Sequence, residues 1–461
     1  MPGSDNRDQR LYIGVDFGGT KILAALITEA GQVLARRRIA TPRGCRPDEA
    51  MGAMTSVLSD LLASRGLEAK AIAAIGVGVA AVVDPDAGRI VATPNMELHG
   101  MDFARPLSAA VGVPVALGND TNLAVLGEAW LGAGRGFASV FSMFIGTGIG
   151  GGLVLDGRLV RGCREFTGEV GHIVMQPNGP LCGCGNRGCL EAFASRTAMD
   201  RDLRQAMAAG RPTVLNELLD SDDSVIKSKV LGKALDAGDA LVTEVLTAAS
   251  EMIGHGCMTV RHLLDPCVIV LGGGVVEACG DFAYPIIRGI VSADQYRGAR
   301  EGGELRFSAL GDDAGILGAA ALARMHVGRG PFDPRFAVAP AYPPLAMPDP
   351  GLVRVADKEV ARDVVVNVYG RTKKPKHMDD RQPAGGVPLG PAQLKRPCKA
   401  GPEVLFVGVQ NGRVELTEAG KDYLARRGIE CFILPAEEAV EKYNESDRRR
   451  AAMILPRMME T

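Results

Sequence analysis

A histidine and three cysteines stand close enough in the sequence to hold one metal ion. His172 precedes Cys182, Cys184 and Cys189, and the three cysteines lie in a glycine-rich segment that is typical of a surface loop. One imidazole and three thiolates suit tetrahedral Zn²⁺, and four protein ligands leave no place for a reactive water. We therefore predict a structural zinc site; the alternative is that the cysteines are reduced and buried as small hydrophobic side chains.

Three glycine-rich segments lie at the ends of predicted strands and could hold phosphate groups. They contain Asp16, Gly18, Gly19, Thr20 and Lys21; Gly146, Thr147 and Gly148; and Gly272, Gly273 and Gly274. Glycines let backbone N–H groups approach phosphate oxygens, and a carboxylate such as that of Asp16 can hold Mg²⁺ through water. Any one segment could be only a tight turn, and none is a GxxxxGK(S/T) loop. The three together favour a nucleotide cleft.

Three further side chains, together with His172, are candidates for proton transfer and for binding hydroxyl groups. Asp120 follows a predicted strand, where ligand crevices of α/β proteins form, so it could act as a general base; the alternative is that it caps the next helix. A metal that fixes His172 and the cysteine loop would bring Glu169, His172 and Glu191 together. Such a group suits a polyhydroxylated ligand, because each hydroxyl both donates and accepts a hydrogen bond. Either glutamate alone would be interpreted as a solvated acid.

The composition is that of a globular protein and argues against two classes of partner. Of the 461 residues, 46% are hydrophobic and 23% charged, and 52 basic against 54 acidic residues give a net charge of −2. Without a basic excess, we expect neither a nucleic acid nor a membrane as partner. Residues 1–10 lack the apolar core of a signal peptide, and ten cysteines without such a signal indicate a cytoplasmic protein.

The hydrophobic pattern predicts strands and helices in two similar halves. We expect strands at 11–16, 21–28, 33–40, 72–83, 113–117, 140–145, 152–155 and 267–271, and helices at 51–62, 120–131, 240–264 and 314–325. Each half contains a strand hairpin with a glycine tip, the first at 18–19 and the second at 146–152. This weak repeat predicts an α/β fold with two lobes that face each other.

A domain boundary is expected near residue 328. Seven of the 27 prolines fall between Pro331 and Pro350, a density that forbids a helix and weakens any strand, so we predict an extended linker over 328–350. Residues 351–456 then show strand patterns at 363–369, 404–409 and 431–434, and helix patterns at 417–427 and from 437 onward. We expect a small C-terminal α/β accessory domain there.

Five motifs stand in the order that is known from one protein family. They are Asp16-Phe-Gly-Gly-Thr-Lys21, Asn119-Asp120, Gly146-Thr-Gly-Ile-Gly150, Gly168-Glu-Val-Gly-His172 and the highly diagnostic Cys182-Gly-Cys-Gly-Asn-Arg-Gly-Cys-Leu-Glu191. On these motifs, residues 11 to about 326 resemble the ROK family of sugar kinases and repressors, in the actin-like ATPase clan. The resemblance implies a two-lobed actin-like (ribonuclease H-like) fold. Its N-terminal lobe would be 11–118, completed by a helix at 313–326, and its C-terminal lobe, with the zinc loop, would be 119–312.

The resemblance also implies an activity, the ATP-dependent phosphorylation of a glucose-like hexose at its 6-hydroxyl. In the family, the residue that matches Asp120 is the catalytic base, and the matching glycine hairpins hold the phosphates of ATP, with Mg²⁺ as cofactor. The positions that are expected to bind the sugar are Asn95, Asn119, Glu169, His172 and Glu191, of which His172 would also bind zinc. A homodimer is expected.

The resemblance leaves the substrate and the role open. Gly78-Val-Ala-Ala81 stands where Gly-x-Pro-Gly is frequent, and Met96-Glu-Leu-His-Gly100 stands where Leu-x-Gly-Trp is frequent. The substrate could therefore be N-acetylmannosamine, N-acetylglucosamine or fructose. A non-catalytic sugar sensor or regulator is the alternative of another class. ROK repressors carry a helix-turn-helix ahead of the kinase-like core, and the first strand here begins near Leu11, which counts against DNA binding.

The C-terminal segment resembles another, smaller family. It is similar to small α/β domains of bacterial and archaeal proteins and of a mitochondrial complex I assembly factor. The matching segments are 402–408, 426–430, 439–444 and 449–452. The resemblance implies no chemistry, and it leaves room for a protein partner of this domain.

Overall fold

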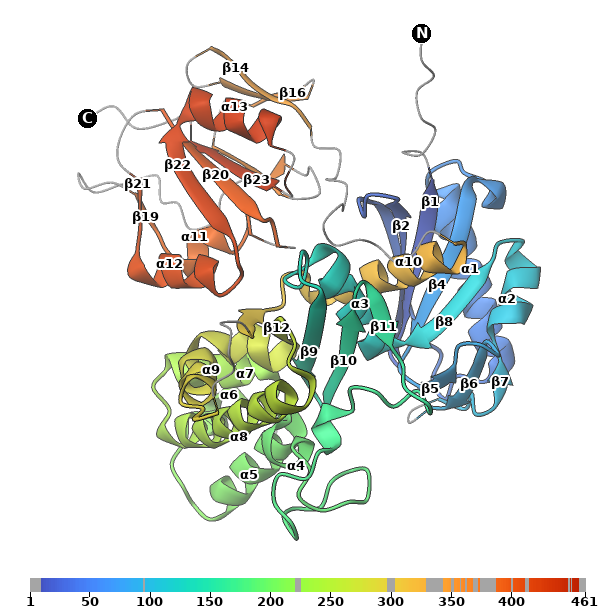
Figure 1. Cartoon of the computed structure of the whole chain (residues 1–461), viewed down its shortest axis with the longest axis vertical. Coiled ribbons are helices and arrows are strands. Elements are labelled where there is room, and N and C mark those ends of the chain that lie inside the picture. The colour runs from blue at the N-terminus through green and yellow to red at the C-terminus, as the bar shows by residue number, and fades with distance from the viewer. Residues whose placement is uncertain are drawn as a thin grey trace.

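The chain, seen in a computed structural model, consists of two lobes and a C-terminal domain (Figure 1). The structure describes residues 10–93, 96–219, 225–296, 303–328, 343–349, 352–356, 358–360, 363–367, 372–373, 387–398, 401–410, 414–446, 448 and 450–455. Strands and helices are mixed in all three parts, so the predicted α/β class is confirmed.

The first lobe is built on a five-stranded sheet in the order β3-β2-β1-β4-β8. Its strands are β1 (Leu11–Phe17), β2 (Lys21–Thr28), β3 (Val33–Ala40), β4 (Ile72–Val79) and β8 (Val115–Asn119). The first three are antiparallel neighbours, whereas β4 and β8 run parallel to β1. Helices α1 (Pro47–Ala63) and α2 (Ala104–Val111) cover one face, and a small sheet consists of β5 (Val82–Asp84), β6 (Arg89–Ala92) and β7 (Met101–Asp102).

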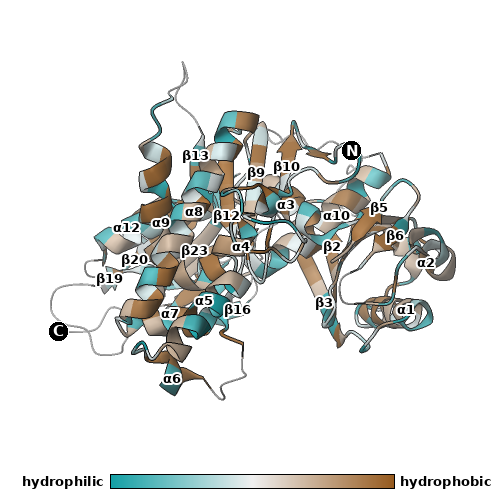
Figure 2. Ribbon diagram, turned by 90° about the horizontal axis from the view of Figure 1, so that it is seen from below, coloured by the Kyte–Doolittle hydropathy of each residue, from teal (hydrophilic) through white to brown (hydrophobic). Residues whose placement is uncertain are grey.

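The second lobe repeats this plan with the strand order β11-β10-β9-β12-β13. Its strands are β9 (Ser139–Ile145), β10 (Ile149–Leu155), β11 (Arg158–Val160), β12 (Val268–Gly272) and β13 (Glu304–Phe307). One face packs against a helical layer of α4 (Glu191–Ala194), α5 (Arg196–Ala208), α6 (Leu215–Leu218), α7 (Ser228–Asp236), α8 (Ala240–Leu264) and α9 (Gly274–Ser292). Strands β9 and β10 are mainly hydrophobic (Figure 2), as expected for strands that are buried on both faces. Within the described residues, no helix is long and apolar enough to cross a membrane.

Two helices, α3 (Asp120–Leu131) and α10 (Ala314–His326), form the layer between the two sheets. Their apolar side chains belong to one buried cluster that also includes Ile27 of the first sheet and Val270 of the second. The lobes therefore share a core along this layer, and α3 begins where the first sheet ends.

Glycines allow α10 to lie unusually close to its neighbours. A Cβ atom at Gly127 of α3 or at Gly318 of α10 would overlap a backbone carbonyl of the other helix, and one at Gly14 or Gly76 of the first sheet would overlap a carbonyl of α10. Any larger residue at these positions would force the helix away from its contacts.

The C-terminal domain has a sheet of its own in the order β18-β17-β23-β20-β22. Its strands are β17 (Val364–Val366), β18 (Thr372–Lys373), β20 (Val404–Val409), β22 (Glu430–Pro435) and β23 (Arg450–Leu455). Helix α13 (Ala436–Glu445) packs on one face, and α11 (Pro391–Leu394) and α12 (Glu418–Ala425) pack on the other. The remaining strands are β14 (Leu345–Asp349), β15 (Leu352–Val355) and β16 (Lys358–Val360) in one sheet, and β19 (Val387–Leu389) and β21 (Val414–Leu416) in another.

This domain docks on the second lobe and on the segment that leads from α3 to β9. The backbone N–H of Phe307 donates to the carbonyl of Arg426 at 2.8 Å, and the Arg426 guanidinium pairs with Asp281 of α9 at 2.8 Å. Arg135, between α3 and β9, pairs with Glu403 at 3.2 Å.

Two predictions about the elements are wrong. The linker expected over 328–350 contains a strand, because β14 (Leu345–Asp349) pairs with β15. Pro348 is tolerated there since β14 is an edge strand whose register shifts between Ala346 and Asp349. The single strand expected at 72–83 is instead divided into β4 and β5, and the backbone N–H of Ala81 turns back to the carbonyl of Val79.

The second glycine tip is shorter than predicted. Only residues 146–148 form the turn, whereas Gly150, Gly151 and Gly152 lie inside β10. A Cβ at Gly150 would lie 2.9 Å from a methyl carbon of Thr121, and one at Gly152 would lie 2.9 Å from the Asn122 side chain. These glycines therefore serve the close approach of α3 to β10, and not a phosphate.

A buried carboxylate joins the two segments that connect the lobes. Glu128 of α3 is 0% exposed, and its oxygens accept from the Ser308 hydroxyl at 2.6 Å. They also accept from the backbone N–H groups of Ala133, Ala309 and Leu310, at 2.9 to 3.2 Å. One side chain thus ties the end of α3 to the 308–310 segment ahead of α10.

We expect Glu128→Ala to lower the free energy of unfolding by about 3 kcal/mol or more, because several buried donors lose a charged acceptor at once. Urea denaturation measures this loss. The control is Glu251→Ala, on the exposed side of α8, which should change stability by less than about 0.5 kcal/mol. A Glu128→Ala protein as stable as that control would contradict the assignment.

Candidate functional site

Two cavities meet at Asp120, the first residue of α3. The larger cavity, of about 640 Å³, lies between the lobes and is lined by residues of both, and the smaller one, of about 240 Å³, lies beside the ends of β1 and β12. Asp120 lines both cavities, and a carboxylate in this position can contact two ligands at once.

Asn119, the residue before Asp120, caps helix α3 and so leaves the Asp120 carboxylate available for a ligand. Asn119, and not Asp120, is the N-cap of α3: its side-chain oxygen accepts from the backbone N–H of Asn122 at 3.0 Å, and its amide donates to the Ala81 carbonyl at 3.1 Å. The alternative that Asp120 caps the helix is therefore wrong. Asp120 accepts one backbone hydrogen bond, from Thr121 at 2.8 Å.

Burial weakens the acidity of this carboxyl. It raises the pKa of Asp120 to about 6, and the nearby negative charge of Asp16 acts in the same direction, while the Thr121 hydrogen bonds oppose the shift. Burial likewise raises the pKa of Asp16, which Lys21 partly offsets. A carboxyl of this kind is still ionised at neutral pH and is basic enough to take a proton.

The larger cavity has a mostly apolar wall from the first lobe, and the second lobe contributes several charged side chains. Residues 80–83 and Thr93 form the first wall, and Arg161, Glu165, Phe166, Glu169 and Cys184 belong to the second. The volume lies within the range of small-molecule sites, which is about 300–1,000 Å³. The predicted site residues Asn119, Asp120 and Glu169 meet here. Asn95 lies outside the described residues, so its contact with a sugar stays a prediction.

An ion pair between two side chains spans the rim of this cavity. Arg161 of the second lobe donates to both carboxylate oxygens of Asp86 in the first lobe, at 2.9 and 3.1 Å, and also contacts Glu165. The hydrogen bond to Asp86 is the first cause that raises the pKa of the Arg161 guanidinium. Since the Asp86 side chain is exposed, this pair orients the rim more than it stabilises the fold.

The smaller cavity has the features of an anion site. Asp16, Lys21, Gly273 and Gly274 line it, together with Thr121, Phe144, Glu277, Gly311, Asp312 and Gly315. The 19-residue helix α9 begins at Gly274, so its N-terminal N–H groups face this cavity and favour negative charge. Gly273 has φ of 88°, a conformation that glycine adopts without strain.

Several predicted phosphate residues do not line either cavity. Gly18, Gly19 and Thr20 form the tip between β1 and β2, which the Thr41 hydroxyl holds by donating to the Gly18 carbonyl at 2.6 Å. Gly146, Thr147 and Gly148 form the tip between β9 and β10, where Arg196 donates to the Thr147 hydroxyl at 2.7 Å. Gly272 is buried at the end of β12 against Phe144. Contacts of these residues with a phosphate stay predictions.

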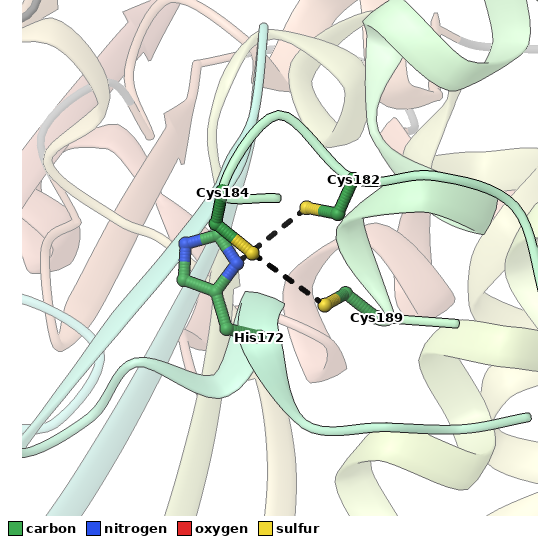
Figure 3. A group of neighbouring side chains, drawn as sticks. All are labelled: His172, Cys182, Cys184 and Cys189. Carbon is green, nitrogen blue, oxygen red and sulfur yellow. Dashed lines mark hydrogen bonds between the residues drawn. The ribbon is translucent and has the colours of Figure 1, made fainter. Parts of the chain in front are cut away.

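His172, Cys182, Cys184 and Cys189 form one cluster, whose ligand atoms all lie within 4.8 Å of one another (Figure 3). The Cys184 and Cys189 sulfurs are 3.8 Å apart, and His172 Nδ1 is 3.6 Å from the Cys182 sulfur. Metal–sulfur bonds of about 2.3 Å in a tetrahedron give sulfur–sulfur edges of about 3.8 Å, so the donor set fits Zn²⁺. Burial raises the pKa of Cys182 to about 12, whereas the Asn186 backbone N–H lowers that of Cys184. A bound cation would deprotonate both.

The cysteine cluster borders the larger cavity through Cys184 and through Glu169, which lies beside His172. His172 directs Nδ1 at the sulfurs, and its Nε2 lies 3.9 Å from the Glu169 carboxylate, which lines the larger cavity. Glu191 accepts from the Cys182 thiol at 3.5 Å and from the Ile149 backbone N–H at 2.8 Å. Glu191 thus joins the cysteine loop to the hairpin of β10. Neither His172 nor Glu191 lines the cavity directly.

Sequence reasoning missed part of both cavities. Arg161, Glu165 and Phe166 gave no motif, since they are placed by the turn after β11. Asp312 could have been found, because it lies within Gly311-Asp-Asp-Ala-Gly315, a segment that also agrees with the family pattern. In the segment 96–100, whose departure from the family pattern leaves the substrate open, Met96 and Leu98 are buried in the core of the first lobe.

Comparison with known proteins identifies relatives of the two lobes. Residues 12–326 match the ROK family. A glucokinase of Streptomyces coelicolor is 34% identical over 322 residues, which is 68% of this chain and 98% of that protein.

Two solved structures resemble the same part of the chain. The ROK hexokinase of Thermus thermophilus has a TM-score of 0.59 at 33% identity, over 69% of this chain and all of that one. The ROK glucokinase of Streptomyces griseus, solved with glucose and AMPPNP, has a TM-score of 0.58 at 33% identity, over 68% of this chain and 99% of that one. These likenesses confirm the predicted actin-like fold.

We expect the Asp120 carboxyl to titrate with a pKa of about 6, and we expect Asp16→Asn to lower this value, because a negative charge beside it is removed. Infrared difference spectra between each protein and its Asp120→Asn counterpart report the carboxyl band against pH. Asp60→Asn, on the exposed side of α1, should leave the titration unchanged. A pKa near 4 in the unaltered protein would refute the proposed burial.

Proposed function

This chain belongs to the ROK family, and from that premise we propose that it is an ATP-dependent kinase that phosphorylates a glucose-like hexose at its 6-hydroxyl. The observation that carries the proposal is the place of Asp120 in the walls of both cavities. The larger cavity would hold the sugar and the smaller one the phosphates of ATP, so the acceptor hydroxyl and the γ-phosphate would meet beside this carboxylate.

Proton removal by Asp120 would accompany phosphoryl transfer. As the sugar oxygen bonds to the γ-phosphorus, the bond from that phosphorus to the bridging oxygen of ADP breaks, and the hydroxyl proton passes to the Asp120 carboxylate. Lys21 and the N-terminus of α9 stand where phosphate charge would lie. Asp16 would hold Mg²⁺ through water, and that ion would neutralise phosphate charge. Closure of the lobes would exclude water that could hydrolyse ATP.

The polar wall of the larger cavity suits sugar hydroxyls. Among the described residues, the Asn119 amide donates one of its two hydrogens, to the Ala81 carbonyl, so the second can bind a hydroxyl, and Glu169 offers carboxylate acceptors. We propose that Zn²⁺ in the cysteine cluster fixes His172 with Nε2–H directed at Glu169, and that Glu191 anchors the loop to β10. The metal would then act on sugar binding through the positions of these side chains.

Ala80 and Ala81 in the wall of the larger cavity do not determine which sugar binds there, or whether the bound sugar is phosphorylated. N-acetylmannosamine, N-acetylglucosamine and fructose are the alternative sugars, and a non-catalytic sugar sensor is the alternative role. ATP consumption measured with each sugar in turn separates these possibilities, because a sensor would bind a sugar without producing ADP.

Further proposals concern the organisation of the protein. We propose lobes at 11–118, with the helix at 313–326, and at 119–312, and an accessory domain at 351–456 of the small α/β family that includes a mitochondrial complex I assembly factor. The parallel strands β20, β22 and β23 with α12 and α13 support this domain. We also propose a cytoplasmic homodimer, in keeping with ten cysteines of which none forms a disulfide, and a protein partner for the accessory domain.

We expect Asp120→Asn to lower turnover by about 10² to 10⁴-fold with little change in sugar affinity, since the amide occupies the same space but takes no proton. Steady-state kinetics and calorimetric sugar binding measure the two effects. Asp60→Asn on the surface of α1 is the control for a lost carboxylate. Turnover near that of the unaltered protein would remove Asp120 from the mechanism.

We expect Cys184→Ser to lose the metal and to weaken sugar binding, because His172 and Glu169 are no longer held. Elemental analysis gives the zinc content and calorimetry the affinity. Cys163→Ser is a matched control, since Cys163 is exposed and lies outside the cluster. A metal-free Cys184→Ser protein with unchanged sugar affinity would contradict the proposed role.

A further inference from the structure

A third cavity, of about 680 Å³, lies where the C-terminal domain docks on the second lobe. Its walls come from α8, α9, β13 and α12, and α12 lies beside α9 in Figure 1. None of its lining residues belongs to either of the two cavities that meet at Asp120. It is therefore a separate site, formed only because the two domains meet.

The walls of this cavity carry an excess of positive charge. Four arginines line it, Arg261, Arg288, Arg306 and Arg426, against two acids, Glu304 and Asp422. Arg306 pairs with Glu304 at 2.7 Å, and Arg426 pairs with Asp422 at 3.7 Å as well as with Asp281. Neither Arg261 nor Arg288 forms an ion pair with any carboxylate of the described residues. Asp294, which pairs with His262 at 2.8 Å, lies near Arg261 but outside the wall, so neither guanidinium has a counter-charge within the wall itself.

The paired arginines are held in place by aromatic rings. Arg426 lies 5.0 Å from the centre of the Tyr284 ring, and Arg306 lies 4.7 Å from that of Phe137. Tyr284 is itself fixed, since its hydroxyl donates to the Leu305 carbonyl at 2.9 Å. Much of the wall is ordered before any ligand enters, which lowers the entropic cost of binding.

We propose that this cavity binds a phosphoryl dianion, either free phosphate or the phosphate of a sugar ester. Guanidinium groups bind phosphate oxygens through paired hydrogen bonds, and the excess of two positive charges in the wall matches the charge of a phosphate at neutral pH. The Ser292 residue in the wall can add a hydroxyl donor. The ligand would bridge the kinase lobe and the C-terminal domain, so it would bind the docked arrangement more tightly than a separated one.

The test is calorimetric titration of the full chain with orthophosphate and, separately, with glucose 6-phosphate. Both are titrated in the presence of a saturating non-hydrolysable ATP analogue and glucose, which occupy the other cavities. We expect one equivalent to bind under these conditions. Tighter binding of orthophosphate would identify free phosphate as the ligand, and tighter binding of glucose 6-phosphate would identify a sugar ester.

Arg261→Gln and Arg288→Gln should each weaken this binding about tenfold, and the double variant should weaken it further. Arg105→Gln, which removes an exposed arginine from α2 of the other lobe, is the matched control and should bind as the unaltered protein does. Absence of binding when the other cavities are filled, or unchanged affinity in the double variant, would overturn the proposal. Because no turnover is measured, such a failure is distinct from a failure of the proposed kinase activity.

Discussion

Helices α3 and α10 approach each other so closely that only glycine fits at Gly127 and Gly318, and this contact fixes the layer between the two sheets from which Asp120 and Gly315 line the cavities. Asp120 begins α3, and the 311–313 turn that lines the smaller cavity leads directly into α10. The buried carboxylate of Glu128 joins the C-terminal end of α3 to residues 308–310, directly ahead of that turn. A shift of either helix would therefore move the carboxylate and the anion site together.

Side chains next to Asp120 form the hydrogen bonds that hold the local structure, so the Asp120 carboxylate is available to act as a base. Asn119 caps α3, and Thr121 contributes hydrogen bonds that keep the carboxylate oriented. Glu191, two residues after Cys189, accepts from the Ile149 backbone N–H. Burial then raises the pKa of the remaining acid, because the surrounding protein solvates its charge less well than water does.

The sequence allowed much of the fold to be predicted, because the elements that carry strong periodicity also dominate the packing. Strands 21–28, 33–40 and 404–409 and the helix at 120–131 have the predicted bounds. The prediction failed where tertiary contacts overrule local preference, as at Gly150, which a neighbouring helix requires inside a strand, and at Pro348, which an edge strand accepts. The roles of Asn119 and Arg161 depend on distances across the cleft, and no spacing along the chain encodes those distances.

The position of α10 in the sequence also bears on how the protein folds during translation. The first sheet is complete at β8, yet the face that carries Gly14 and Gly76 stays uncovered until α10 has been made roughly 200 residues later. At about 5–20 residues per second, the ribosome needs roughly 10–40 s to reach it. During that interval the nascent first lobe exposes an apolar sheet face that chaperones could bind, and its folding is completed only when the kinase core is nearly finished.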